Sequence, residues 1–246
     1  MDEIFEPHLN NLITSFSFEL QPIINASNFK ITDYEFLLRS KKSNRFPLNE
    51  FNLITQNDTN NTIYMQWLKK ALVQELIKDP AKIISVNLDP QQLIYPSTHV
   101  FLSEMAKYHS QLTIEITEQK PLTTEQRPCF SNQLCQMEQL GYKLAFDDIG
   151  SGQNTLELLL HELEHFKRVK LSILKFQKLN TKLLAELLTF FHMLAQDEQL
   201  ELVVEGIDCM EKAELALNHG ICLQQGFWWR DLINNQQLTQ LHNLGK

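Results

Sequence analysis

The sequence is poor in glycine and cysteine, and it has no long apolar segment. Its 246 residues include 7 glycines, with no GxGxxG motif and no P-loop, which disfavours a nucleotide-binding doubly wound sheet. The 4 cysteines show no CxxC spacing, which excludes a disulfide scaffold and favours a reducing compartment. No apolar run approaches the roughly 18 to 20 residues of a membrane span, and the N-terminus lacks a signal-peptide layout. We therefore expect a cytoplasmic protein without a membrane partner.

Basic residues are outnumbered by acidic ones. The chain has 22 basic and 30 acidic residues, a net charge of -8 and a pI near 5.5. Duplex nucleic acids are bound through faces rich in lysine and arginine, so we expect no duplex nucleic acid partner. The sequence also has no internal repeat and no linker-like segment, which predicts one domain over residues 1–246.

Short apolar runs, most of them rich in isoleucine, valine, leucine and phenylalanine, predict buried strands. They cover residues 18–26, 31–39, 82–88, 112–117, 142–149, 166–171, 200–207 and 221–229. Residues 62–77 and 183–194 have the spacing of helices, whereas residues 27–30 leave room only for a hairpin turn. The sequence therefore predicts an α/β fold, a TIM-like (β/α)₈ barrel with an antiparallel first strand. A doubly wound sheet is the alternative.

Acidic and amide side chains interrupt or end these apolar runs. They are Glu35, Asn87, Glu115, Asp147, Asp148 and Glu205. Barrel enzymes place their chemistry at the carboxyl ends of the strands, and several converging buried carboxylates require cations. Oxygen donors without histidine or cysteine suit Mg²⁺ or Mn²⁺. The alternative at each position alone is a helix cap or an ion pair, and Lys170 would then be a counter-ion.

The order of these motifs resembles a known family. The signature lies at Tyr34-Glu35-Phe36-Leu37-Leu38-Arg39, and further matches are Gln21-Pro22-Ile23, Val86-Asn87-Leu88, Glu115-Ile116-Thr117-Glu118, Asp147 to Gly152, Lys170, Glu205-Gly206-Ile207-Asp208 and Gln225-Gly226-Phe227. The pattern is similar to that of EAL domains, the bacterial cyclic di-GMP phosphodiesterases, with Phe36 where the family usually has alanine. The resemblance covers residues 18–240.

The resemblance implies hydrolysis of cyclic di-GMP to linear pGpG by two divalent metals, Mg²⁺ or Mn²⁺. It assigns the first metal to Glu35, Asn87, Glu115 and Asp147, and the second to Asp147, Asp148 and Glu205. Lys170, Glu205 and Gln225 would be catalytic, with Lys170 contacting the attacking water and Gln225 helping to place it. Gln21 and Leu37 would face a guanine. Arg39 would contact a substrate phosphate, and its alternative is a surface salt bridge.

Departures from the family pattern leave other functions open. Ser172 stands where the family has an aspartate, which predicts weaker metal occupancy or slower turnover. The loop from Ile149 to Leu156 is altered, and Asp208 replaces the glutamate that anchors it. The adjacent Trp228 and Trp229, taken as extended, would point to opposite faces, one of them available to a partner. The alternatives are a cyclic di-GMP receptor with little turnover, or a regulator of motility genes that binds a transcription regulator. A homodimer and roles in biofilm formation and motility also follow by resemblance.

Overall fold

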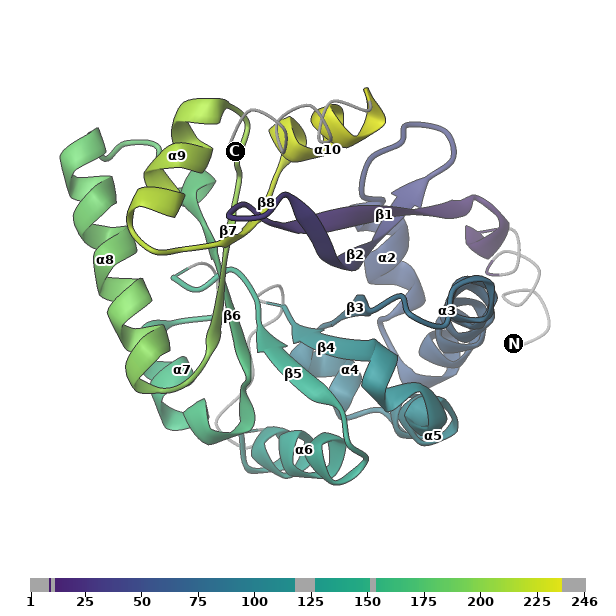
Figure 1. Cartoon of the computed structure of the whole chain (residues 1–246). Coiled ribbons are helices and arrows are strands. Elements are labelled where there is room, and N and C mark those ends of the chain that lie inside the picture. The colour runs from purple at the N-terminus through teal and green to yellow at the C-terminus, as the bar shows by residue number, and fades with distance from the viewer. Residues whose placement is uncertain (1–8, 10–11, 118–126, 151–153, 236–246) are drawn as a thin grey trace.

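The strands form a closed barrel. The computed structural model describes residues 9, 12–117, 127–150 and 154–235, and the strands follow chain order around the barrel (Figure 1). They are β1 (Phe16–Asn25), β2 (Lys30–Ser40), β3 (Ile84–Leu88), β4 (Leu112–Ile116), β5 (Lys143–Phe146), β6 (Arg168–Ser172), β7 (Glu201–Glu205) and β8 (Leu223–Gln225). Each predicted apolar run contributes one strand, so the predicted barrel is confirmed.

The first strand runs against its two neighbours, as expected from the short hairpin. β1 pairs antiparallel with β2 and with β8, and all other neighbouring strands are parallel. In the turn, the Asn25 side chain accepts hydrogen bonds from the backbone and hydroxyl of Ser27 at 3.0 and 2.6 Å. Phe29 takes a positive φ of 56° there. The hairpin places Gln21 directly opposite Glu35.

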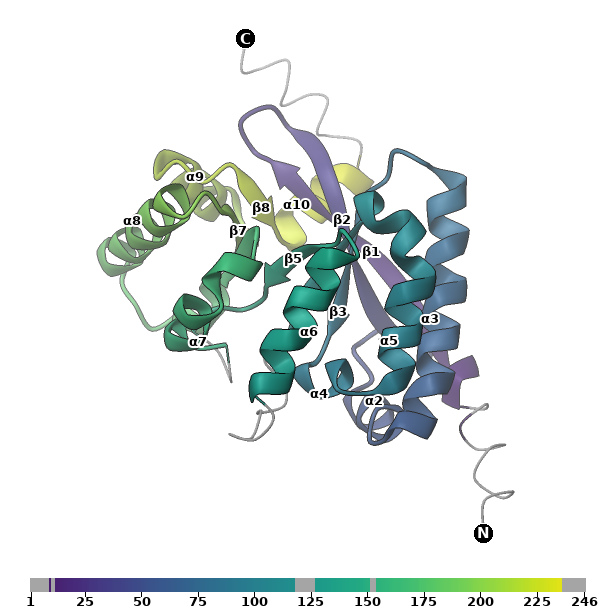
Figure 2. The same cartoon turned by 90° about the horizontal axis from the view of Figure 1, so that it is seen from below.

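Helices cover the outside of the barrel (Figures 1 and 2). They are α2 (Leu48–Ile54), α3 (Asp58–Lys78), α4 (Pro90–Leu93), α5 (Pro96–Met105), α6 (Arg127–Gln139), α7 (Leu156–His161), α8 (Thr181–Asp197), α9 (Met210–Asn218) and α10 (Phe227–Asn234). Short 3₁₀ helices add η1 (Ala106–Gln111), η2 (Leu163–His165) and η3 (Ile173–Phe176). The two helices predicted from periodicity lie within α3 and α8. None of the helices in the described ranges combines the length and apolarity needed to cross a membrane.

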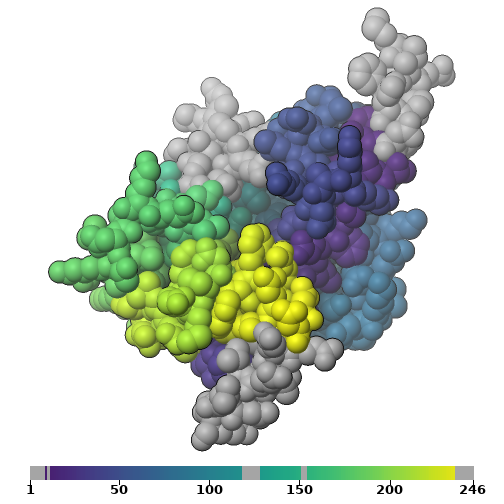
Figure 3. All heavy atoms as spheres, turned by 90° about the horizontal axis from the view of Figure 1, so that it is seen from above, coloured from purple at the N-terminus to yellow at the C-terminus, as the bar shows by residue number. Residues whose placement is uncertain are grey.

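The tryptophan pair corrects one prediction. Trp228 and Trp229 lie in α10, not on an extended strand, because β8 ends at Gln225. At Gly226 a Cβ atom would lie 2.0 Å from the carbonyl oxygen of Ile207, so only glycine fits this close approach. Trp229 is 1% exposed and donates its indole N–H to Gln224, while Trp228 is partly buried against the core. On the face seen in Figure 3, helix α10 (yellow) lies beside α9 (yellow-green).

Strands β3, β4 and β6 alternate apolar and polar side chains. On β4, the buried Leu112, Ile114 and Ile116 belong to the apolar core, whereas Thr113 and Glu115 take the other face. Because successive side chains of a strand point to opposite faces, the apolar set packs under the helices and the polar set points into the barrel. The interior of the barrel is therefore where buried charges gather.

Candidate functional site

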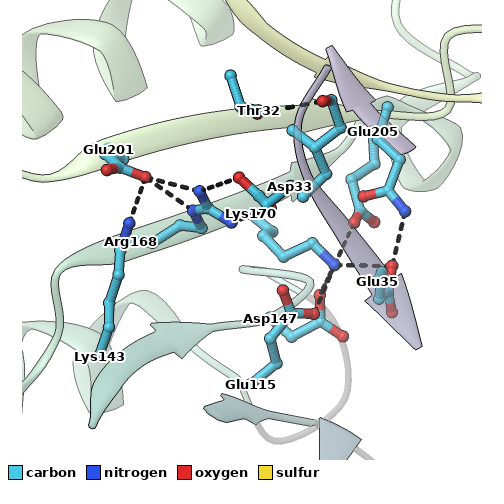
Figure 4. Close-up of polar contacts among 12 residues, drawn as sticks. Thr32, Asp33, Glu35, Glu115, Lys143, Asp147, Arg168, Lys170, Glu201 and Glu205 are labelled. Atoms are coloured by element: carbon cyan, nitrogen blue, oxygen red, sulfur yellow. Dashed lines mark hydrogen bonds and ion pairs between the residues drawn. The ribbon is translucent and has the colours of Figure 1, made fainter. Parts of the chain in front are cut away.

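A buried lysine lies at the centre of the acidic site. The side chain of Lys170 on β6 is 1% exposed, and its ammonium group makes ion pairs with carboxylates on β2, β4 and β7 and with Asp147, which directly follows β5 (Figure 4). Its Nζ lies 3.1 Å from Glu35, 2.7 Å from Glu115, 3.2 Å from Asp147 and 2.6 Å from Glu205. We call these five residues the Lys170 cluster. Lys170 is thus the shared counter-ion of these four carboxylates, which is the structural alternative stated for it above.

Two amide side chains hold Glu35 in this cluster. Asn87 donates to Oε1 of Glu35 at 2.7 Å, and Gln225 donates to Oε2 at the same distance. Burial by itself raises the pKa of Glu35, but the charge of Lys170 and these hydrogen bonds outweigh it and lower the pKa. Glu35 is therefore held as a carboxylate with a fixed orientation.

The other carboxylates of the cluster retain protons more readily. Burial raises the pKa of Glu115 and of Asp147, against the opposing charge of Lys170. Burial also raises the pKa of Glu205 to about 7, and the negative charges of Glu35 and Asp148 add to the effect. Four carboxylates share one ammonium group, so full ionisation leaves three uncompensated negative charges in the cluster. Such a cluster must take up protons or bind cations.

Asp148 extends the acidic group beyond the cluster. Asp147, Asp148 and Glu205 place ligand oxygens within 4.8 Å of one another, and no other acidic, histidine or cysteine side chains do so in the described part of the chain. Asp148 has a positive φ of 48°, and its Oδ2 lies 3.3 Å from the Lys175 ammonium group. This trio is the group expected to bind the second metal.

The donor atoms of the site fit divalent cations. Asn87 Oδ1, Glu115 Oε1 and Asp148 Oδ1 are buried and have no hydrogen-bond partner among the described residues. Buried oxygens without a donor are costly, and hard cations such as Mg²⁺ and Mn²⁺ take oxygen ligands of this kind. The excess of negative charge and the unpartnered oxygens are therefore consistent with bound divalent metals.

Two neighbouring hollows share part of their lining at the acidic cluster. One, of about 380 Å³, includes Gln21 and Ser172 in its lining, and the other, of about 310 Å³, includes Arg39 and Asn87. Both hollows are lined by the residues Glu35, Leu37, Asp147 and Asp148. The residues assigned to substrate binding thus surround the residues assigned to metal binding, although they come from distant parts of the sequence.

Arg39 and Ser172 occupy contrasting surroundings. Arg39 pairs with Glu19 across the hairpin, with 3.0 Å between Nε and Oε2, so the salt bridge considered as its alternative is present. Ser172 is buried at the end of β6, directly opposite Glu205 in the β6–β7 register, and adds a hydroxyl where the family has a carboxylate. The predictions for residues 151–153 of the altered loop lie outside the described residues.

Sequence reasoning missed Lys175 and Arg168. A lysine shortly after a strand carries no signal that separates it from any surface lysine. Arg168 does carry one, because it precedes Lys170 by two positions and so shares its face of β6. Its guanidinium group binds Asp33 through two 2.8 Å hydrogen bonds and also bonds Glu201, which pairs with Lys143 (Figure 4). We call these four residues the Arg168 layer.

Comparisons with known proteins agree with this geometry. A family model described as EAL domain matches residues 9–231. Cyclic di-GMP phosphodiesterase TpdA of Vibrio parahaemolyticus is 25% identical over 224 residues, covering 88% of this chain and 37% of that protein. The chain spans between 18% and 42% of the length of the curated relatives it matches.

Solved structures share the fold. An EAL domain protein from Listeria monocytogenes has a TM-score of 0.72 at 21% identity, covering 93% of each chain. Klebsiella pneumoniae BlrP1, in a structure described as a manganese and cyclic di-GMP complex, has a TM-score of 0.69 at 23% identity. That match covers 87% of this chain and 55% of BlrP1. At these identities the likeness concerns the fold alone.

Proposed function

Because the chain belongs to the EAL domain family, we propose that it is a phosphodiesterase that hydrolyses one phosphodiester bond of cyclic di-GMP to give linear pGpG. The observation that carries the proposal is the Lys170 cluster, in which four buried carboxylates share one ammonium group. When ionised, these carboxylates carry three more negative charges than Lys170 balances, and binding of divalent cations compensates this surplus. The name of the relative TpdA supports the same substrate.

The residues divide into groups with different tasks. Glu35, Asn87, Glu115 and Asp147 would hold one divalent cation, and Asp147, Asp148 and Glu205 would hold or orient a second. Bound Mg²⁺ or Mn²⁺ would lower the pKa of a water molecule and stabilise the negative charge that develops on the phosphoryl oxygens. Lys170, Glu205 and Gln225 are the catalytic residues of the proposal. Lys170 and Gln225 contact Glu35, and Glu205 pairs with Lys170.

Substrate binding is assigned to the rim of the two hollows. Gln21 and Leu37 would face a guanine, and Arg39 would give bidentate hydrogen bonds to a phosphate. Arg39 now pairs with Glu19, so a phosphate would have to compete with that carboxylate.

The test is a hydrolysis assay with purified protein, cyclic di-GMP and either Mg²⁺ or Mn²⁺, with pGpG measured by chromatography. We expect pGpG to form, and to stop forming when the metal is chelated. Glu104→Gln is a suitable control, because Glu104 is an exposed acid that pairs with Lys69 on the outer helices. It should retain full activity.

The other outcomes of this assay correspond to the two alternative functions. Tight binding of cyclic di-GMP without formation of pGpG would indicate a receptor rather than an enzyme. Ser172, which is neutral where the family has an aspartate, is the basis of this alternative. Absence of nucleotide binding together with binding of a transcription regulator would support a protein-binding role in motility control. A homodimer and a cytoplasmic location remain predictions from the sequence.

A further inference from the structure

Glu19 lies between two arginines beside the hollows of the site. It stands on β1, directly opposite Leu37 of β2, and its side chain is 29% exposed. Oε2 of Glu19 lies 3.0 Å from Nε of Arg39, and Oε1 lies 3.8 Å from Nη1 of Arg230. The two arginines come from β2 and from α10, near opposite ends of the sequence. One carboxylate thus has two basic partners, one for each of its oxygens.

Arg39 is the arginine that faces the ligand site. Its side chain lines the hollow of about 310 Å³, together with Asn87 and Asp147. Besides its ion pair with Glu19, it donates Nη1 to the carbonyl oxygen of Leu38 at 3.1 Å. A phosphate that binds to Arg39 competes with Glu19, because both anions use the same guanidinium group. Binding of the ligand therefore takes away one of the two basic partners of Glu19.

Arg230 stays beside Glu19 when Arg39 is taken by a ligand. Its guanidinium carbon lies 4.4 Å from the centre of the Phe227 ring, and its Nε and Nη2 donate to Oδ1 of Asp231, each at 3.2 Å. The cation–π contact and the ion pair hold the guanidinium group in place. The remaining nitrogen, Nη1, is the one that lies near Glu19. Arg230 is not among the described residues that line the two hollows, so it reaches a ligand there through its neighbours.

We propose that Arg230 is a positioning residue for ligand binding, which keeps Glu19 paired when a phosphate of the ligand binds to Arg39. The inference rests on the proposed function in taking a phosphate of cyclic di-GMP as the ligand of Arg39. With Arg230 in place, the phosphate displaces one of two ion pairs of Glu19. Without Arg230, the same phosphate leaves an unpaired carboxylate close to the bound anion, and like charges repel at short range. Arg230 therefore raises ligand affinity without changing the rate of the chemical step.

The test is a double-mutant cycle on Glu19 and Arg230. The Kd of cyclic di-GMP is measured by calorimetric titration with Ca²⁺, and kcat and KM are measured from pGpG release with Mn²⁺. Arg230→Gln should raise Kd and KM about fivefold, the upper range of an exposed ion pair, with kcat unchanged. Glu19→Gln should lower Kd, because the competing carboxylate is gone. In the Glu19→Gln background, Arg230→Gln should have no further effect on Kd, because no carboxylate is left for it to hold.

Arg45→Gln is the matched control. Arg45 is exposed and directly precedes Phe46, which lines the same hollow as Arg39. The substitution removes the same charge from this side of the site without touching Glu19. Its Kd should stay within about twofold of the wild-type value, because solvent and salt screen an exposed charge.

Each further outcome decides between the inference and the proposed function. A rise in Kd for Arg230→Gln that persists in the Glu19→Gln background would overturn the inference, because Arg230 would then act through Phe227 or on the ligand itself. An unchanged Kd in Arg230→Gln would overturn it as well, and formation of pGpG in that case would leave the proposed function standing. The predicted cycle in Kd without any pGpG formation would refute the proposed function and leave the inference standing. A wild type that binds no cyclic di-GMP would overturn both.

Discussion

Two charged groups lie at successive levels of the same barrel, and their charge balance differs. The Arg168 layer contains two acids and two bases, with Arg168 bound to Asp33 by paired hydrogen bonds. The Lys170 cluster lies one step further along the same strands, since Glu35 follows Asp33 by two residues on β2 and Lys170 follows Arg168 by two on β6. It contains four acids and one base.

The comparison separates charges that stabilise the fold from charges that are available for function. In the Arg168 layer every acid has a basic partner, so the layer is complete without a ligand. In the Lys170 cluster the same strands carry a surplus of carboxylates, which raises the pKa of Asp147 and Glu205 through burial and mutual repulsion. Substitutions in the Lys170 cluster should therefore lower activity most, whereas substitutions in the Arg168 layer should lower stability most.

The largest expected effect is on catalysis, from Glu35→Gln. The substitution removes a proposed metal ligand and also sets the new amide against the amides of Asn87 and Gln225, which now donate to Glu35. Turnover of cyclic di-GMP should fall by a factor of about 10³ or more, comparable to losing a major electrostatic contribution to a transition state. The measurement is the rate of pGpG release at saturating Mn²⁺.

Thermal unfolding supplies the control for Glu35→Gln. Because the lowered pKa of Glu35 means that its carboxylate stabilises the fold, the metal-free variant should unfold at a somewhat lower temperature than the wild type but remain folded at the assay temperature. If this variant turned over cyclic di-GMP at the wild-type rate, Glu35 would not be a metal ligand of the site.

Asp33→Asn should affect stability rather than activity. It would leave the buried guanidinium group of Arg168 without its bidentate partner, which costs about 3 kcal/mol or more of unfolding free energy. Denaturant unfolding measures the loss, and pGpG release per folded molecule should stay near the wild-type value. Loss of activity in fully folded protein would show that the Arg168 layer takes part in function.

The pH dependence of metal binding follows from Glu205. Burial, reinforced by the charges of Glu35 and Asp148, raises its pKa to about 7, so protons compete with the metal below that pH. Mn²⁺ affinity should fall by up to about tenfold per pH unit below 7 and level off above it. Calorimetric titrations between pH 5.5 and 8.5 would measure this.

The stability of the metal-free protein should change in the opposite direction. The folded-state pKa of Glu205 lies above its unfolded value, so the contribution of its proton is fully present at low pH and is lost as the pH rises through 7. Unfolding temperatures should therefore decline over this interval without metal and recover when Mn²⁺ is added. Affinity and stability that stay constant between pH 5.5 and 8.5 would contradict the assigned environment of Glu205.

The smallest predicted effect is that of Ser172→Asp. A carboxylate at the end of β6 would lie opposite Glu205 and would add an oxygen ligand for a cation to the hollow that Asp148 lines. At subsaturating Mn²⁺ we expect turnover to rise about threefold, because one more oxygen ligand beside Asp148 would strengthen cation binding by about 0.7 kcal/mol. A decrease would mean that the surroundings are adapted to serine.

The barrel and the members of the acidic site follow from local sequence. Apolar runs separated by helical stretches predict the strands, and the four-residue gap predicts the hairpin. The convergence of Glu35, Glu115 and Asp147 follows because parallel strands present their carboxyl ends at one edge of the barrel. Closure of the barrel then fixes which residues meet.

Partners across the barrel could not be predicted from the sequence. Lys170 and Glu35 are 135 residues apart, as are Arg168 and Asp33, and alternation along a strand gives the face of a side chain but not its partner. Trp229 lies in a helix because β8 ends at Gln225 and α10 begins directly after Gly226. Gly226 packs closely against the backbone of Ile207, and this tertiary contact has no signature in the local sequence. Lys175 reaches Asp148 for a similar reason, through the position of η3.

Anomalous diffraction from crystals of this protein soaked in Mn²⁺ tests the central claim most directly, because it locates bound metal without requiring turnover. We predict anomalous density among Glu35, Glu115, Asp147 and Glu205, and none at the Arg168 layer. Anomalous density for Mn²⁺ at other positions with none among these carboxylates would contradict the account. Density only at the Arg168 layer would contradict it as well.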